Sequence, residues 1–185
     1  MAHPSILVKG RTALVVVDVQ EAFRGLISDL EDVAGRIAIA VAGFHILGSP
    51  VIVTEQYPKG LGPTVAEIKS VLNDDDPIFE KTAFSSCGAA PFVEKLEELG
   101  VNQVLLCGLE THICVSQTAH DLLDRGYQVH VLVGSVCSRV PYNRRVGLRK
   151  MFSSGVIAAS IEMALFELMG DSKHESFKEI QALIK

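Results

Sequence analysis

An acidic residue, a lysine and a cysteine each stand beside a short apolar run in this chain. Asp18 directly follows "ALVVV", Lys81 lies in "FEKTAF", and Cys114 comes shortly after "VLLC". A thiolate attacks carbonyl carbon, a carboxylate can take the proton of the thiol, and a nearby lysine keeps that carboxylate ionised. Together these residue types are suited to nucleophilic hydrolysis if the fold brings them to one place.

Cys114 has two interpretations. Free cysteines are often buried and then behave as small inert hydrophobes. If Thr111 caps a helix, however, Cys114 lies in the first turn, where unpaired N–H groups and the helix dipole stabilise a thiolate and an oxyanion. Its position favours the nucleophile, whereas Cys87, Cys107 and Cys137 are interpreted as structural.

Asp18 and Lys81 also have alternative roles. An aspartate at a strand end commonly bonds loop amides, and a loop lysine is most often solvated. In an apolar cleft, desolvation raises the pKa of a carboxyl group, which suits a general base. Placed between Asp18 and Cys114, Lys81 would hold the acid ionised and polarise a substrate oxygen. The sequence alone leaves both pairs of alternatives open.

Short apolar runs alternate with helical patterns along the chain, which predicts one α/β domain over residues 1–185. We expect a three-layer, doubly wound sheet of six mostly parallel strands with helices on both faces. The expected strands are 12–18, 49–55, 77–82, 101–108, 127–134 and 156–160, and the expected helices are 30–47, 64–72, 90–100, 111–126, 146–155, 161–170 and 176–185.

This architecture predicts where chemistry takes place. In open α/β sheets the ligand crevice lies beyond the carboxyl ends of the strands, where the strand order reverses. Three expected strands end at Asp18, at Glu55 and Gln56, and at Lys81. Glu110 and Cys114 follow a fourth. We therefore expect these side chains at one edge of the sheet.

Composition limits the function classes. The chain has 185 residues, 48% of them hydrophobic and 21% charged, and a formal net charge of −5. That charge argues against a nucleic-acid partner, because phosphate binding needs clustered lysine and arginine. The apolar stretch at 36–55 is interrupted by Gly48, Ser49 and Pro50, so a buried helix and strand are expected there rather than a membrane span.

The absence of certain motifs from the sequence predicts the location of the protein and its need for a cofactor. The N-terminal residues show no secretory pattern, and four irregularly spaced cysteines suit free thiols in a reducing compartment, so a cytoplasmic location is expected. The sequence lacks zinc-type cysteine spacing, a dinucleotide-binding GxGxxG and a phosphate loop. We predict a small-molecule substrate and no cofactor.

Three segments resemble the isochorismatase-like cysteine hydrolases, a superfamily that includes nicotinamidases and N-carbamoylsarcosine amidases. "ALVVVDVQEAF" looks like the strand with the catalytic aspartate, "FEKTAFSS" like the lysine segment and "CGLETHICVSQTA" like the nucleophile segment. The resemblance puts the catalytic roles at Asp18, Lys81 and Cys114. "EQYPKGLGPT" and the ending "ELMGDSKHESFKEIQALIK" look most like the isochorismatase domain-containing proteins.

The resemblance also implies the shape of the site. Family members usually carry a non-proline cis peptide before the cysteine, here Leu109–Glu110, which turns the amides of Glu110 and Cys114 into an oxyanion hole. Phe23 matches a position that lines the substrate pocket. Homo-oligomers are common in the family and are expected here.

Neighbouring residues complete the expected pocket. Gln56 and Tyr57 belong to a glycine-rich turn that we expect to line it. Glu110 adds a charge near the mouth, either as a solvent-facing loop acid or as a contact for a cationic or hydrogen-bond-donating substrate.

One departure from the family bears on the chemistry. Nicotinamidases bind a metal through an Asp-x-His pair after the second strand, where this chain has Gln56 and Pro58. The site is therefore predicted to be metal-independent, and a retained Cys114 favours cleavage of an amide-like C–N bond. Vinyl-ether hydrolysis through Asp18 alone and a non-catalytic binding or scaffold role stay open as alternatives.

Overall fold

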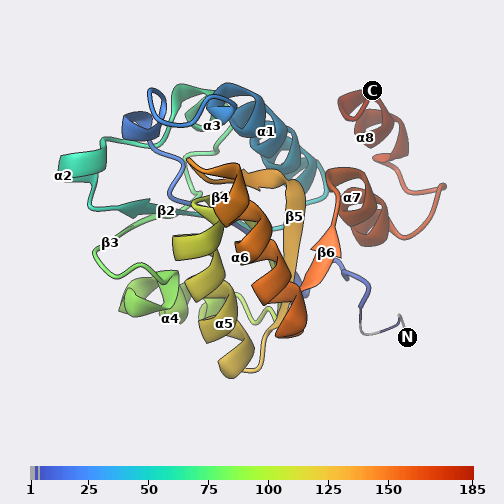
Figure 1. The fold of residues 1–185 in the computed structure, drawn as a ribbon. Helices are drawn as coiled ribbons and strands as arrows, with labels where there is room; N and C mark the ends of the chain where they lie inside the picture. The colour runs from blue at the N-terminus through green and yellow to red at the C-terminus, as the bar shows by residue number, and fades with distance from the viewer. Residues whose placement is uncertain (1–2, 4) are drawn as a thin grey trace.

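The computed structural model describes residue 3 and residues 5–185, which form a sheet of six strands with every neighbouring pair parallel. The order across the sheet is β3-β2-β1-β4-β5-β6 (Figure 1). The strands are β1 (Thr12–Val17), β2 (Val51–Gln56), β3 (Ile78–Lys81), β4 (Gln103–Leu109), β5 (Gln128–Cys137) and β6 (Ile157–Ala159). The expected fold class is confirmed.

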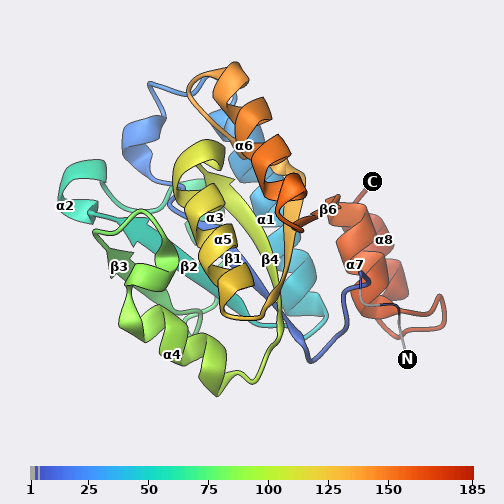
Figure 2. The ribbon, with the colours of Figure 1, turned by 60° about the horizontal axis from the view of Figure 1, so that its bottom comes forward.

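Helices cover both faces of the sheet (Figures 1 and 2). One core layer joins the sheet to α1, α7 and α8, and the other joins it to α4, α5 and α6. The helices are α1 (Leu30–Ile46), α2 (Pro58–Leu61), α3 (Ala66–Lys69), α4 (Ala90–Glu98), α5 (Ser116–Asp124), α6 (Pro141–Ser153), α7 (Ile161–Met169) and α8 (Phe177–Leu183).

The central strand β1 shows why the sequence folds into layers. Its residues are all buried, and alternate side chains point to opposite faces, as strand geometry requires. Leu14 and Val16 pack in the layer of α1, while Ala13, Val15 and Val17 pack in the layer of α4 and α5. A strand covered on both sides appears in sequence as a continuous apolar run.

Three local features differ from expectation. β5 extends to Cys137, three residues beyond the predicted end at 134, and so carries the following loop to the edge of the sheet. Pro58 begins the short helix α2 where only a turn was expected, because proline suits the first helical position. Residues Thr111–Val115 form a π-helical turn before α5.

The strand order reverses between β1 and β4, which places the expected crevice beyond their carboxyl ends. Gly108 of β4 pairs with Val17 of β1 at that end. A Cβ atom on Gly108 would lie 2.1 Å from the Val17 carbonyl oxygen, and its φ of 114° is unfavourable for other residues. Glycine here lets the two strands approach closely just below the crevice.

Of the helices that the structure describes, none is long and apolar enough to cross a membrane.

Candidate active site

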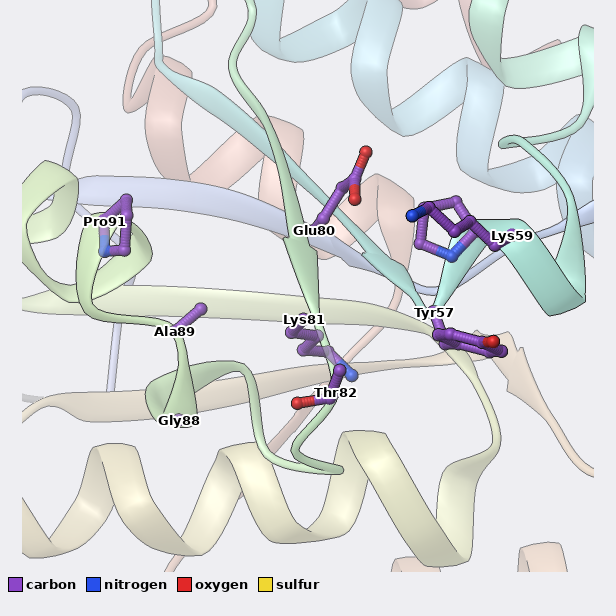
Figure 3. Close-up of a pocket in the computed structure, with 9 residues that line it drawn as sticks. Tyr57, Lys59, Glu80, Lys81, Thr82, Gly88, Ala89 and Pro91 are labelled. Atoms are coloured by element: carbon purple, nitrogen blue, oxygen red, sulfur yellow. The ribbon is translucent and has the colours of Figure 1, made fainter.

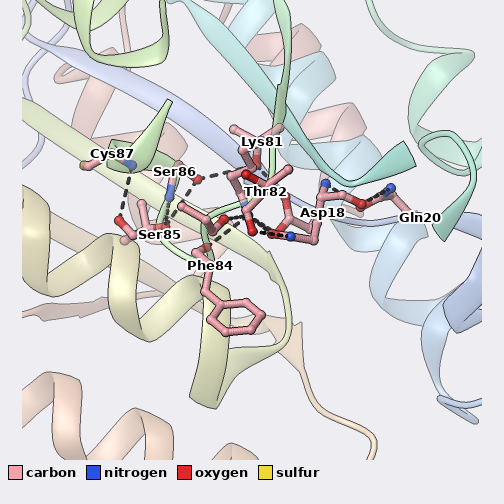
Figure 4. A network of polar contacts seen from close by, with 12 residues as sticks. Asp18, Gln20, Lys81, Thr82, Phe84, Ser85, Ser86 and Cys87 are labelled. Atoms are coloured by element: carbon pink, nitrogen blue, oxygen red, sulfur yellow. Dashed lines mark hydrogen bonds and ion pairs between the residues drawn. The ribbon is translucent and has the colours of Figure 1, made fainter. Parts of the chain in front are cut away.

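Asp18 lies at the centre of a buried polar network at the end of β1 (Figure 4). Its backbone is in the left-handed region, with φ at 52°, and its amide donates to the Thr54 carbonyl oxygen. The Thr54 hydroxyl donates to Asp18 Oδ1 at 2.7 Å, and Lys81 Nζ lies 2.6 Å from Oδ2. Left-handed backbone at a non-glycine residue costs free energy and is concentrated at functional sites.

Lys81 is occupied entirely by contacts within the protein. Besides Asp18, Nζ donates to Gln56 Oε1 at 2.9 Å, to the Phe84 carbonyl at 3.0 Å and to the Ala83 carbonyl at 3.3 Å. An ammonium group has three donors, and these four acceptors use all of them. Lys81 therefore forms an ion pair with Asp18, but the expected polarisation of a substrate oxygen has no free donor in this arrangement.

Cys114 occupies the π-helical turn Thr111–Val115 and is 8% exposed. Glu110, rather than the expected Thr111, is the N-cap of this turn. Burial first, and then the negative charge of Asp18, raise the pKa of Cys114 to about 12, while the charge of Lys81 acts in the opposite direction. This direction is opposite to the expected stabilisation of a thiolate, because burial and the charge of Asp18 both favour the neutral thiol.

A cavity of about 260 Å³ joins the predicted residues. Asp18, Phe23, Gln56, Glu110 and Cys114 all line it. Lys81 instead lines a different cavity, although its Nζ reaches Asp18. Its remaining wall is mainly apolar and consists of Leu26, Leu61, Phe84, Leu109, Ile113 and Arg139. Apolar walls with a few converging polar groups are typical of small-molecule sites.

Tyr57 lines a different cavity from Cys114. That cavity has a volume of about 460 Å³ and lies between α2 and the start of α4, with Lys59, Glu80 and Pro91 among its other walls (Figure 3). Tyr57 itself is in a left-handed conformation, with φ at 39°, and is not among the residues that line the cavity of Cys114. Its expected place in the substrate pocket is corrected accordingly.

Glu110 is buried and paired, not a solvent-facing loop acid. It is 5% exposed, and its Oε1 accepts hydrogen bonds from the Arg139 amide at 3.0 Å and from Arg139 Nε at 3.1 Å. Hydrogen bonding to Glu110 raises the pKa of Arg139. The carboxylate thus connects the start of the nucleophile turn to the loop after β5.

The Leu109–Glu110 bond differs from the family expectation. The described residues contain no cis peptide bond, so Leu109–Glu110 is trans, the form that non-proline residues strongly prefer. An oxyanion hole formed by the amides of Glu110 and Cys114 stays a prediction.

The β5–α6 segment holds the nucleophile turn in place. The Thr111 hydroxyl donates to the Cys137 carbonyl at 2.9 Å, and His112 Nδ1 lies 3.1 Å from the Ser138 hydroxyl. Gly147 of α6 packs so closely that a Cβ atom there would lie 2.9 Å from His112 Cα. These contacts fix the backbone that carries Cys114.

Several side chains that support the site have no recognisable signal in the sequence. The Thr118 hydroxyl donates to Ser86 Oγ at 3.2 Å, and Ser86 Oγ lies 3.5 Å from the Thr54 hydroxyl, so a chain of hydroxyl groups connects α5 to Asp18. Isolated serines and threonines carry no distinguishing pattern in sequence. Arg139 was missed because the predicted strand stopped at 134, which left residue 139 too far from the edge of the sheet.

Within residues 3 and 5–185, no group of three or more histidine, cysteine, aspartate or glutamate side chains lies together in a way that could hold a metal ion. The metal-independent site stays a prediction.

The chain is similar to known proteins in both sequence and structure. A sequence model of the Isochorismatase domain matches residues 12–163. The secreted isochorismatase effector Isc1 of Phytophthora sojae is 43% identical over 184 residues, covering 97% of this chain and 87% of that protein. Isochorismatase domain-containing protein 1 of Salmo salar is 42% identical over 179 residues, covering 97% of this chain and 62% of its own length. The structure of a MAR1 ribonuclease from Caenorhabditis elegans matches with a TM-score of 0.92 and 41% identity, covering 97% of this chain and 92% of that one.

Proposed function

Because the chain belongs to the isochorismatase domain family, we propose that it is a cysteine hydrolase acting on an amide-like C–N bond of a small molecule. Cys114 is the nucleophile, Asp18 the general base, and Lys81 the counter-charge that keeps Asp18 ionised. The observation that carries the proposal is that Cys114 and Asp18 line one small cavity while Asp18 is held by Lys81.

The proposed reaction starts from a protonated thiol. Asp18 takes the thiol proton as Cys114 Sγ bonds to the substrate carbonyl carbon, and the carbonyl oxygen becomes an oxyanion. The C–N bond then breaks, and Asp18 returns the proton to the leaving amine. Water, deprotonated by Asp18, attacks the thioester and releases the acid and the thiol.

The raised pKa of Cys114 is compatible with this sequence. A thiol that is protonated at neutral pH needs a base beside it at the moment of attack, and a buried ionised carboxylate is such a base. The amides of Glu110 and Cys114 are proposed as the donors to the oxyanion. The chain's own residues supply every proton transfer, so the proposed mechanism needs no metal.

Two alternative functions predict different results from the experiments described below. Vinyl-ether hydrolysis would depend on Asp18 and survive loss of Cys114. A binding or scaffold protein would keep the cavity without turnover. The word ribonuclease in the name of the Caenorhabditis elegans protein is not carried over, because a net charge of −5 and a cavity of about 260 Å³ do not suit an RNA strand. A homo-oligomer and a cytoplasmic location stay predictions.

The test compares iodoacetamide labelling of each cysteine in the wild type and in Asp18→Asn, by peptide mass spectrometry. Asp18→Asn removes the proposed base, which should slow labelling of Cys114. It also removes the charge that raises the thiol pKa, which should speed labelling. A general base predicts slower labelling of Cys114 in the variant. Faster labelling would mean that Asp18 only suppresses the thiolate, which contradicts the proposal.

A second test of the proposed function measures substrate turnover. Ammonia release from a panel of small amides should be lost in Cys114→Ala and Cys114→Ser, with circular dichroism unchanged. Hydrolysis that persists in Cys114→Ala would favour the vinyl-ether alternative instead.

A further inference from the structure

Arg139 is a partly exposed residue in the wall of the Cys114 cavity. It follows the long strand β5 and lines the same cavity as Asp18 and Cys114. Its side chain is 51% exposed, so the guanidinium group is in contact with solvent and available to an entering molecule.

The orientation of this guanidinium group is fixed from one side. The buried Glu110 carboxylate binds both the amide and Nε of Arg139 through Oε1. Because the guanidinium group is planar, fixing Nε also fixes the plane in which Nη1 and Nη2 lie. Neither Nη atom donates to any residue within the described part of the chain.

The other polar groups of the cavity are already engaged. Lys81 and Thr54 occupy both oxygens of Asp18, and the Gln56 side chain binds Lys81 and the Thr82 carbonyl. The rest of the wall is mainly apolar. Among the described residues that line the cavity, Arg139 is therefore the one cation with unused donors.

A pair of N–H donors in one plane matches the two oxygens of a carboxylate. We propose that Arg139 anchors a carboxylate of the substrate, so that the preferred substrates are small amides that carry a carboxylate group. This inference rests on the proposed function, because the anchor is useful only if the amide carbonyl then reaches Cys114. The Glu110 charge beside Arg139 moderates the attraction, and we expect a preference of about tenfold, near the lower limit for a charge-assisted hydrogen bond.

Two alkylating agents of similar size provide the test. Iodoacetate carries a carboxylate and iodoacetamide is neutral; in both reactions the Cys114 S–C bond forms, iodide leaves and the thiol proton passes to Asp18. The measured quantity is the ratio of the iodoacetate rate to the iodoacetamide rate at Cys114, with Cys87 and Cys137 as references in the same protein.

The ratio should fall about tenfold in Arg139→Gln, through loss of the iodoacetate rate. Arg139→Lys, which keeps the charge but not the planar pair of donors, should retain part of the preference. Arg11→Gln makes the same change of charge at the opposite edge of the sheet and should leave the ratio unchanged. A ratio in Arg139→Gln equal to that of the wild type would overturn the inference.

A measurement on the wild type alone covers the case in which Arg139→Gln does not fold. Succinamate should protect Cys114 from iodoacetamide at concentrations about tenfold lower than its neutral analogue succinamide. Equal protection by the two compounds would also overturn the inference. If iodoacetamide labels Cys114 no faster than Cys87 or Cys137, it is the proposed function that fails.

Discussion

The ammonium nitrogen of Lys81 lies 2.6 Å from Oδ2 of Asp18, and the two side chains are 1% and 2% exposed. Both charges have been removed from water, so each is tolerated only because the other is present. The pair lies beside the buried thiol of Cys114, because Asp18 and Cys114 line the same cavity.

Lys81→Met should destabilise the protein by about 3–5 kcal/mol, because it leaves the Asp18 charge buried without a partner. The double variant Asp18→Asn/Lys81→Met should recover a large part of that loss. Urea unfolding of the two variants measures both effects. Lys59→Met, which changes an exposed lysine, should alter the free energy of unfolding by less than about 0.5 kcal/mol. If the double variant is no more stable than Lys81→Met, the pairing argument is wrong.

Much of the fold follows from residue patterns. The buried run in β1 and the run "VLLC" in β4 are continuous because helices cover both of their faces. Strand ends are harder to predict than strands, because a terminal residue such as Cys137 is held by ladder bonds and tertiary packing that local pattern does not encode.

The sequence predicts the position of a site residue when that residue comes directly after a predicted strand. Asp18 and Cys114 could be placed at one edge of the sheet, since parallel strands end on the same side. The position of Tyr57 and the contact between Arg139 and Glu110 depend on loop backbone, namely a left-handed turn at 57 and the path of the chain after β5. Those conformations are set by three-dimensional packing.

Gly147→Ala should destabilise the protein by about 1–3 kcal/mol and slow iodoacetamide labelling of Cys114. The new methyl group would lie 2.9 Å from His112 Cα and 3.0 Å from the Thr111 carbonyl, so the nucleophile turn has to move. Gly35→Ala in α1 is the matched control, since nothing lies within 4 Å of its Cβ position. There alanine should stabilise the helix by up to about 1 kcal/mol. Unchanged labelling in Gly147→Ala would show that the contact does not position Cys114.

Alkaline pH should destabilise the fold through its buried thiols. Burial is the first cause that raises the pKa values of Cys114 and Cys137 to about 12 from an ordinary 9.0. Unfolded thiols lose their protons near pH 9 while the folded ones keep them. The stabilisation is therefore complete below pH 9 and is lost as the pH rises toward about 12.

Urea unfolding between pH 8 and pH 11 measures this loss. Cys137→Ala should reduce the downward slope above pH 9 by up to about 1.4 kcal/mol per pH unit, the contribution of one proton. Val136→Ala, a neighbouring buried substitution without a titrating group, should leave the slope unchanged. An identical slope in Cys137→Ala and the wild type would contradict the assigned pKa.

Acid should destabilise the protein through His130, which lies in β5, is 1% exposed and has no hydrogen-bond partner for Nε2 among the described residues. Burial lowers its pKa from 6.5 to about 4, so the unfolded chain binds this proton first. Stability from the neutral imidazole is complete above pH 6.5 and is lost as the pH falls toward about 4. Urea unfolding from pH 7.5 to 4.5 should show a shallower loss in His130→Met than in the wild type, by up to about 1.4 kcal/mol per pH unit. His3→Gln changes an exposed histidine and should follow the wild-type curve. A His130→Met curve parallel to that of the wild type would show that other groups, such as the carboxylates, account for all of the acid sensitivity.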